Sequence, residues 1–399
     1  ETVLDKSAVE SALDHASHAI VSLSQARDLY ETLCRNAPSD PSLRAQLTTC
    51  ITSLASAQRS IGQRAELTAT LRRACDFWTE CIRLHQDNPR HRKELCEYWC
   101  AIANLERAAE APDRAIAALR RARELAFDLV RQGHVETLAQ ERLARMCYDL
   151  AEMLRASGQR AEALRAVGQA QELWESIASD HPASLDDQAQ LAVCLFLGGA
   201  LNSDVGRPAE ALRRFRRSVA IIKCAARARP NVVDYQCHLA TCFHSIGNVL
   251  IEVGQPADAV DSYRQALALR EQLCRATPAD ALQQSNYGGT WNRLGEALEQ
   301  LGRGAEAAEA YRQAIVHQEI ACARDPGSAK FRSYLDGHRR HLSQLEGGLN
   351  HAPNARGDAG SRGESLGPAP SIPTTGLSPA SQRHSGLRNR GSTQLPEPT

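Results

Sequence analysis

The sequence is poor in aromatic residues, carries no net charge and lacks long apolar runs. Only 5% of its 399 residues are aromatic, and 47 Lys and Arg side chains balance 47 Asp and Glu side chains. This balance gives no electrostatic preference for nucleic acid or for an acidic membrane surface. No stretch approaches the roughly 18 consecutive apolar residues that a transmembrane helix needs. We therefore expect neither nucleic-acid binding nor a membrane segment in this chain.

The motifs of common catalytic sites are missing as well. The chain has no phosphate-binding glycine loop followed by Lys, and no His-Arg-Asp or Asp-Phe-Gly element of a kinase. His15 and His18, like His338 and His341, are spaced to share one helix face, but no third metal ligand accompanies either pair. We interpret them as solvated surface imidazoles. We predict no catalytic residue, no bound metal and no cofactor.

The thirteen cysteines follow no zinc or redox spacing. Cys96 and Cys100, at i and i+4, would need two further ligands to hold a metal. Six others occupy repeat positions that otherwise carry apolar or small residues, so we interpret them as buried thiols. An odd number of scattered cysteines is typical of a reducing compartment, and we expect a cytoplasmic location. The six lie in two columns: Cys34, Cys274 and Cys322, then Cys50, Cys194 and Cys242.

The main feature that the chain does have is an internal repeat. The segment VGQPADAVDSYRQALALREQLCRATP (253–278) returns 48 residues later as LGRGAEAAEAYRQAIVHQEIACARDP (301–326). It also occurs 48 residues earlier, as VGRPAEALRRFRRSVAIIKCAARARP (205–230). The same interval separates a column of glycines, in which Glu110 is the exception. This column comprises Gly62, Gly158, Gly206, Gly254 and Gly302.

Three further columns of the repeat are almost entirely Ala, Gly or Ser. Two helices approach closely only where side chains are short, so we expect the small columns to face each other. A column of larger apolar residues would then fill the space between the helices. The first small column is Ser7, Ala55, Ala103, Ala151, Gly199, Gly247 and Gly295, and the larger column is Leu23, Leu71, Leu119, Val167, Phe215, Tyr263 and Tyr311.

Each repeat is predicted to be a hairpin of two helices. Apolar residues recur at helical spacing from Leu239 to Leu250, and Gly254 would end this first helix in a left-handed conformation. Pro256 suits the first turn of a second helix, and Pro278 marks its end. Each helix would have about twenty residues and a length of about 30 Å.

One basic run, RRFRR (213–217), would be able to contact phosphates. However, Phe215 falls in the larger packing column. We therefore interpret the neighbouring arginines as the solvent-exposed face of a helix.

The repeat resembles the tetratricopeptide repeat. WNRLGEALEQLGRGAEAAEAYRQAI (291–315) carries the aromatic, Leu-Gly, Gly, Ala, aromatic and Ala positions of that family. The familiar unit of the family is shorter, with about 34 residues, so this chain looks like a variant with longer helices. The resemblance implies an all-α, tetratricopeptide-like α-solenoid, which is a right-handed superhelix of antiparallel helix hairpins.

The resemblance also suggests a division of the chain. We expect a partial N-terminal repeat at 1–38, six hairpins at 39–326, a polar capping helix at 327–348 and a disordered Pro/Gly/Ser/Arg-rich tail at 349–399. The chain begins with Glu1 and a partial repeat, so we expect it to be a segment of a longer protein. YQCHLATCFHSIGNVLIEVGQPADAVDSYRQALALREQL (235–273) is similar to repeats in planctomycete-type bacterial serine/threonine protein kinases.

In this repeat family the second, fifth, ninth and twelfth positions of each motif face the concave groove. A lysine at the fifth position, which the family uses to bind a C-terminal carboxylate, is missing from every copy. Asn side chains can satisfy the backbone amides of an extended peptide, although any single position also fits an ordinary solvated helix surface. The candidate groove residues are Asn104, Arg107, Arg145, Tyr148, Glu152, Arg155, His244, Asn248, Asn292 and Glu296.

From these patterns we predict a non-catalytic scaffold that binds protein or peptide partners in its groove. The alternative is a regulatory or scaffolding part of a serine/threonine kinase whose catalytic domain lies upstream of residue 1.

Overall fold

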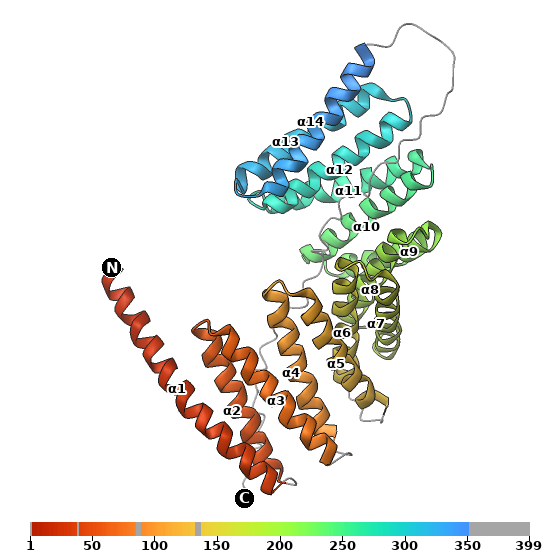
Figure 1. Cartoon of the computed structure of the whole chain (residues 1–399). Coiled ribbons are helices and arrows are strands. Elements are labelled where there is room, and N and C mark those ends of the chain that lie inside the picture. Colours follow the sequence, from red (N-terminus) through yellow and green to blue (C-terminus); the bar gives the residue numbers. More distant parts are fainter. Residues whose placement is uncertain (1, 38–39, 85–88, 132–136, 351–399) are drawn as a thin grey trace, which may run out of the picture. The chain divides into compact units, whose positions relative to one another are not determined.

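The structure, a computed structural model, describes residues 2–37, 40–84, 89–131 and 137–350. Fourteen helices and no strand are formed by these residues (Figure 1), which confirms the predicted all-α class. The tail predicted to be disordered lies, from residue 351 on, outside the described residues.

The helices alternate between first and second members of hairpins. The first helices are α2 (Pro41–Ser60), α4 (Pro89–Ala108), α6 (Thr137–Ala156), α8 (Leu185–Asp204), α10 (Val233–Glu252), α12 (Ala281–Gln300) and α14 (Ala329–Asn350). The second helices are α3 (Arg64–Leu84), α5 (Pro112–Arg131), α7 (Arg160–Asp180), α9 (Pro208–Ala228), α11 (Pro256–Ala276) and α13 (Gly304–Arg324), and α1 (Thr2–Asn36) precedes them all. Within each set, successive helices begin one repeat interval apart, so the helix boundaries keep the interval of the sequence.

The turns inside the hairpins follow the glycine column. Its five glycines have φ between 70° and 75°, in the left-handed region that glycine tolerates best. Glu110, the exception in the column, adopts the same conformation with φ 54° and is the non-glycine residue with positive φ in the described chain. The backbone of the turn is therefore kept even where its preferred residue is absent.

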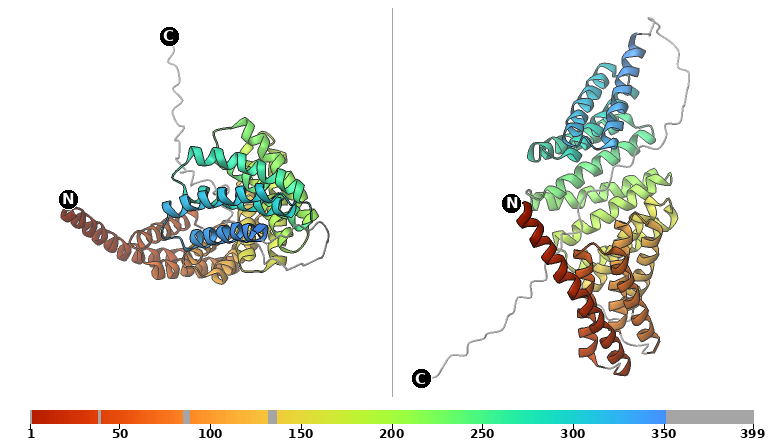
Figure 2. Two further views of the ribbon diagram at one scale, coloured as in Figure 1. Left: turned by 90° about the horizontal axis from the view of Figure 1, so that it is seen from above. Right: turned by 60° about the vertical axis from the view of Figure 1, so that its left-hand side comes forward.

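The chain divides into two compact units, Glu1–Ile221 and Ile222–Thr399, which we call unit 1 and unit 2. In unit 1, each helix from α1 to α8 packs against the next, and in unit 2 the same holds from α10 to α14. Because neighbours run in opposite directions, the first helices of one unit run parallel to each other, as α12 and α14 do (Figures 1 and 2).

The two helices of a hairpin meet where the small column packs directly against the larger column. A Cβ atom on Gly247 would lie 2.5 Å from the ring of Tyr263, and one on Gly295 would lie 2.6 Å from the ring of Tyr311. Glycine thus stands where the partner is aromatic. Where the partner is aliphatic, sixteen positions later, the small residue is alanine, as in Ala103 with Leu119.

The first helix of the chain departs from the hairpin pattern. The position that corresponds to the turn glycines is Asp14, and α1 continues through it as one helix of 35 residues. Ser7, which falls in the column of first helices, therefore lies on the same helix as Leu23.

The packing of glycine against tyrosine predicts coupled substitutions in α10 and α11. Gly247→Ala should lower the free energy of unfolding by about 1–3 kcal/mol, because the new methyl group overlaps the ring of Tyr263. Gly247→Ala with Tyr263→Leu recreates the Ala–Leu combination of α4 and α5, so the double variant should be more stable than the sum of the single effects predicts, by about 1 kcal/mol or more. Urea unfolding of the four proteins measures this coupling, and additive effects would contradict the direct contact.

The exceptional turn residue gives a second prediction. Glu110→Gly should raise the free energy of unfolding by about 1 kcal/mol, because glycine adopts a φ of 54° without the steric cost that glutamate incurs. Gly158→Ala, at the equivalent turn, should lower it by a similar amount. Thermal unfolding of both variants measures these two opposite changes in stability. A Glu110→Gly protein less stable than the wild type would contradict the prediction.

Candidate functional site

Unit 2 contains a groove with a volume of about 1220 Å³. Its walls are the first helices α10, α12 and α14, and Tyr263 and Tyr311 reach it from the second helices α11 and α13. On α12, the lining residues recur every three or four positions, so they form one stripe along the helix. This stripe consists of Leu282, Ser285, Asn286, Gly289, Asn292, Arg293, Glu296, Glu299 and Gln300.

A hydrogen-bonded network holds the middle of the groove. Asn292 Nδ2 donates to Glu296 Oε1 at 2.7 Å, and Arg293 Nη1 donates to Glu296 Oε2 at 2.6 Å. His341 Nδ1 of α14 lies 3.0 Å from Asn292 Oδ1, which ties the two walls together. Burial disfavours the charged form of Arg293, but the carboxylate of Glu296 outweighs it and raises the pKa of the guanidinium. The network therefore offers a fixed polar surface in which the central charges are paired.

Two tyrosines orient polar side chains at the edge of the groove. Tyr263 Oη donates to Asn248 Oδ1 at 2.8 Å, and Tyr311 Oη donates to Glu299 Oε2 at 2.9 Å. Because its oxygen accepts from tyrosine, Asn248 is oriented with its amide nitrogen left to donate elsewhere. Such a fixed donor is suited to a carbonyl group of a bound chain.

The buried histidines of the groove are neutral near pH 7. Burial, with the positive charges of Arg270 and Arg293, lowers the pKa of His244 well below its usual value. Burial, with His341 and Arg293 nearby, lowers the pKa of His338 to about 4. The sequence-based interpretation of His338 as a solvated imidazole was wrong, because His338 is only 7% exposed. His341 is partly exposed, and both residues line the groove.

The structure brings together four of the ten predicted groove residues: His244, Asn248, Asn292 and Glu296. The other six lie on α4 and α6 in unit 1, where they interact mainly with each other or with neighbouring helices. Asn104 accepts from Arg107 at 3.1 Å, Tyr148 donates to Glu152 at 2.9 Å, Arg155 pairs with Asp204 at 2.6 Å, and Arg145 is partly buried.

The sequence-based prediction missed the contribution of the last helix. Gly337, Arg340 and Gln344 of α14 line the groove, and each lies one full repeat after a groove position of α12. The repeat interval would have identified them, but the helix was interpreted only as a polar cap. In the structure α14 is a wall of the groove.

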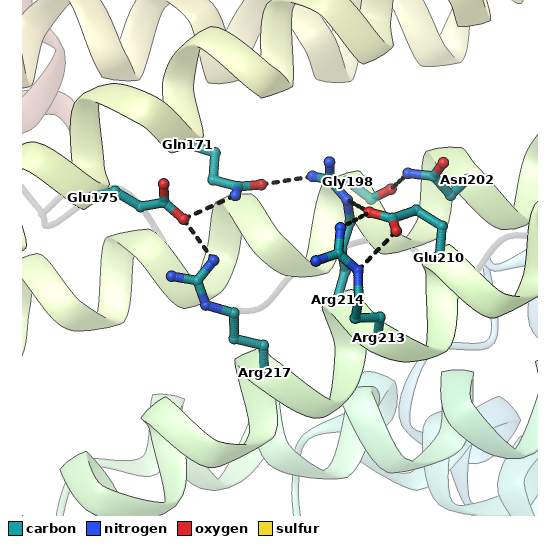
Figure 3. A network of polar contacts seen from close by, with 8 residues as sticks. All are labelled: Gln171, Glu175, Gly198, Asn202, Glu210, Arg213, Arg214 and Arg217. Carbon is teal, nitrogen blue, oxygen red and sulfur yellow. Dashed lines mark hydrogen bonds and ion pairs between the residues drawn. The ribbon is translucent and has the colours of Figure 1, made fainter.

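The residues of the basic run on α9 are held by packing and by ion pairs within unit 1. Phe215 is buried, with 1% of its surface exposed, as its place in the larger column predicts. Carboxylates of the same unit hold three of the arginines at distances of 2.6–2.8 Å: Arg213 and Arg214 with Glu210, and Arg217 with Glu175 (Figure 3).

The histidines and cysteines considered as metal ligands do not form a metal site in the described part of the chain. No group of three or more His, Cys, Asp or Glu residues there is arranged to hold a metal ion. Cys96 is buried, and its Sγ donates to the carbonyl oxygen of Ala122 at 3.3 Å. Of the six column cysteines, Cys322 is partly buried and the other five are buried. None of the described helices has the length and apolar character needed to cross a membrane.

Two segments of the chain match models of the tetratricopeptide repeat, residues 239–275 and residues 289–315. Both contribute helices to the groove. Among curated proteins, the sequence has no significant match.

Solved structures with a similar fold are known. The apo form of RapI is 14% identical, with a TM-score of 0.50 over 84% of this chain and 86% of that chain. The apo form of the quorum sensor NprR from B. thuringiensis is 16% identical, with a TM-score of 0.49 over 87% and 86% of the two chains. MamA is 15% identical, with a TM-score of 0.38 over 58% and 95%. At these identities the likeness to RapI concerns the fold alone, and that fold is a helical repeat.

The neutral His338 makes stability depend on pH. Its pKa is about 4 in the folded chain and near 6.5 when exposed, so the unfolded chain binds the proton first as the pH falls. The stabilising contribution is complete above pH 6.5 and is lost as the pH falls to 4.

We therefore expect the free energy of unfolding of the wild type to fall between pH 6.5 and 4 by about 3 kcal/mol more than that of His338→Gln. Asp149, whose pKa burial raises to about 6, opposes this trend equally in both proteins. Urea unfolding at intermediate pH values provides the comparison, and parallel curves for the two proteins would show that His338 is not buried in neutral form.

Proposed function

We propose that this chain is a non-catalytic interaction scaffold that binds an extended segment of a partner protein in the groove of unit 2. The observation that carries this proposal is the groove itself, because it is lined by the same face of three successive first helices. Tetratricopeptide repeats at 239–275 and 289–315 support the proposal. We also propose that the 48-residue repeat of this chain is a longer variant of the tetratricopeptide repeat.

The length of the groove suits an extended peptide. Its lining runs along α12 from Leu282 to Gln300, which corresponds to about 27 Å of helix. An extended chain covers this length with about eight residues. A segment of this size is long enough to be recognised by sequence and short enough to bind without folding.

The polar groups of the groove suit the backbone of such a segment. Asn248 and Asn286 lie on α10 and α12, and both line the groove. The side-chain amide of Asn can donate to a peptide carbonyl and accept from a peptide N–H, so two such groups can align an extended backbone. Because the central Arg293 and Glu296 are paired with each other, the groove does not depend on a charged terminus for binding.

Three features stay predictions. They are the division of the chain into repeats, a cap and a tail, the cytoplasmic location, and the kinase domain upstream of residue 1. All thirteen cysteines are free thiols in the structure, which supports a proposal of a reducing compartment. The binding role does not require a kinase domain.

Selection of phage-displayed random ten-residue peptides on the full chain tests the proposed function. Peptides enriched on the wild type should bind Asn248→Ala and Asn286→Ala about tenfold more weakly, because each substitution removes a hydrogen bond to the peptide backbone. Fluorescence anisotropy with one enriched, fluorescein-labelled peptide measures the dissociation constants.

Asn104→Ala is the matched control, because Asn104 occupies the repeat position of Asn248 but lies on α4 in unit 1. It should leave the affinity unchanged. If Asn104→Ala abolished binding while Asn248→Ala did not, the site would lie in unit 1 and the proposal would be wrong.

A further inference from the structure

One face of α1 is exposed, although the same face of α7, α11 and α13 is buried. Leu29 and Leu33 are 66% and 45% exposed, Ser22 is exposed as well, and Ala26 is partly buried. Their spacing of four, three and four residues places these side chains on one stripe of α1, which we call the open face. The residues equivalent to Ser22, Ala26 and Leu33 are at most 8% exposed in the other three helices. They are Ala166, Ala170 and Ile177 of α7, Ser262, Ala266 and Leu273 of α11, and Ala310, Ala314 and Ala321 of α13.

In a complete hairpin, the first helix covers this face. A Cβ atom on Gly288 of α12 would lie 2.9 Å from the backbone oxygen of Ala314 and 3.5 Å from the Cβ atom of His317, both on α13. Ala314 and His317 stand a whole number of repeat intervals after Ala26 and Leu29. The open face of α1 is therefore the face on which the first helix of the same hairpin packs.

On another side, α1 makes the contacts of an ordinary second helix. Arg73 of α3 donates to Glu31 of α1 at 2.8 Å, and Arg217 of α9 donates to Glu175 of α7 at 2.6 Å (Figure 3). The two pairs occupy the same repeat positions, so α1 is joined to the following hairpin as α7 is. These contacts leave the open face free.

The sequence that would pack on the open face belongs to α1 itself. Ser7 precedes Leu23 by sixteen positions, just as Gly247 precedes Tyr263, whose ring it approaches across the hairpin. In one continuous helix, however, sixteen residues correspond to about 24 Å along the axis. The early part of α1 therefore does not reach the open face of its own chain while the helix is continuous.

The open face is complementary in size to a second copy of itself. Along the helix it carries two small residues, Ser22 and Ala26, followed by two large ones, Leu29 and Leu33. When two such helices run antiparallel, Ser22 of each lies opposite Leu33 of the other, and Ala26 lies opposite Leu29. The spacing is that of a coiled-coil seam, along which side chains of two helices interdigitate. Every layer then combines a small residue with a large one, as the hairpins of this chain do.

Two charged residues beside the open face already have partners. Asp28 pairs with Arg73 at 2.7 Å, and Arg35 pairs with Glu80 at 3.6 Å. The exposed residues Gln25 and Thr32, which also flank the open face, are uncharged. Contact between two open faces therefore does not leave either charge without its partner, which would be costly.

We propose that two copies of this chain pair through the open faces of their α1 helices, in antiparallel orientation. In each copy, α1 of the other copy takes the place of the first helix that completes a hairpin. The pairing is two-fold symmetric, so each contact between a small and a large residue forms twice. The four layers extend over about 16 Å of helix, and we expect a reversible dimer with a micromolar dissociation constant. This inference is independent of the proposed peptide-binding function.

Analytical ultracentrifugation of the full chain at rising concentrations tests the pairing. The average mass should rise from 43.5 kDa towards twice this value. Leu29→Glu should raise the dissociation constant of the dimer at least tenfold, because pairing would bury a carboxylate in a central layer. The melting temperature of the monomeric variant should stay that of the monomeric wild type, because Leu29 is largely exposed in the single chain.

Leu84→Glu is the matched control. Leu84 is the last residue of α3 and is 61% exposed, much like Leu29, but it lies outside the open face. The substitution adds the same charge to the same unit, and it should leave the dissociation constant unchanged.

A pair of opposite charges tests the antiparallel orientation. Leu33→Glu alone should weaken pairing at least tenfold. Adding Ser22→Lys should restore at least part of the affinity, because each new ammonium group lies opposite a new carboxylate of the other copy. In a parallel pair, equal charges would meet at both positions, and the second substitution would weaken pairing further.

The other outcomes decide against the inference. A chain that stays monomeric at about 100 μM, or a dimer that Leu29→Glu leaves intact, would overturn it. A fall in the melting temperature of monomeric Leu29→Glu would show that Leu29 is packed within the single chain, and would also overturn it. Pairing that Ser22→Lys does not restore would contradict the antiparallel orientation. None of these results bears on the groove of unit 2.

Discussion

The structure depends on the close approach of the two helices of each hairpin. This approach is possible because the first small column faces the larger column. Each small residue lies sixteen positions before a large one. The pairs adjust to each other: Ala103 is followed by Leu119, whereas Gly247 meets Tyr263 and Gly295 meets Tyr311. Different pairs of side chains thus make the contact between the two helices of a hairpin.

The groove of unit 2 follows from this regular packing. When hairpins repeat with one geometry, equivalent positions of α10, α12 and α14 lie on one face, and residues on that face are free of the packing constraint. The two kinds of glycine show the difference. Gly295 is glycine because Tyr311 occupies the space of its side chain, whereas Gly289 faces open space in the groove. Packing explains the first.

The sequence was sufficient to predict the fold because its repeat is visible residue by residue. The helical class, the left-handed turns and the burial of Phe215 were confirmed. The site was predicted less well. His338 was assigned to the surface because a histidine spacing does not reveal which neighbours bury a side chain, and only the packing of α14 against α13 makes that clear. The contact of Asn292 on α12 with His341 on α14 depends likewise on how two helices pack, which the spacing along one helix does not contain.

Hydrogen exchange of the full chain with and without a selected peptide tests the central claim most directly. Our account predicts that the peptide slows exchange in α10, α12 and α14, the three first helices of unit 2, and leaves α4 and α6 unchanged. Slower exchange confined to α4 and α6, or a bound peptide that protects none of the first helices, would contradict it.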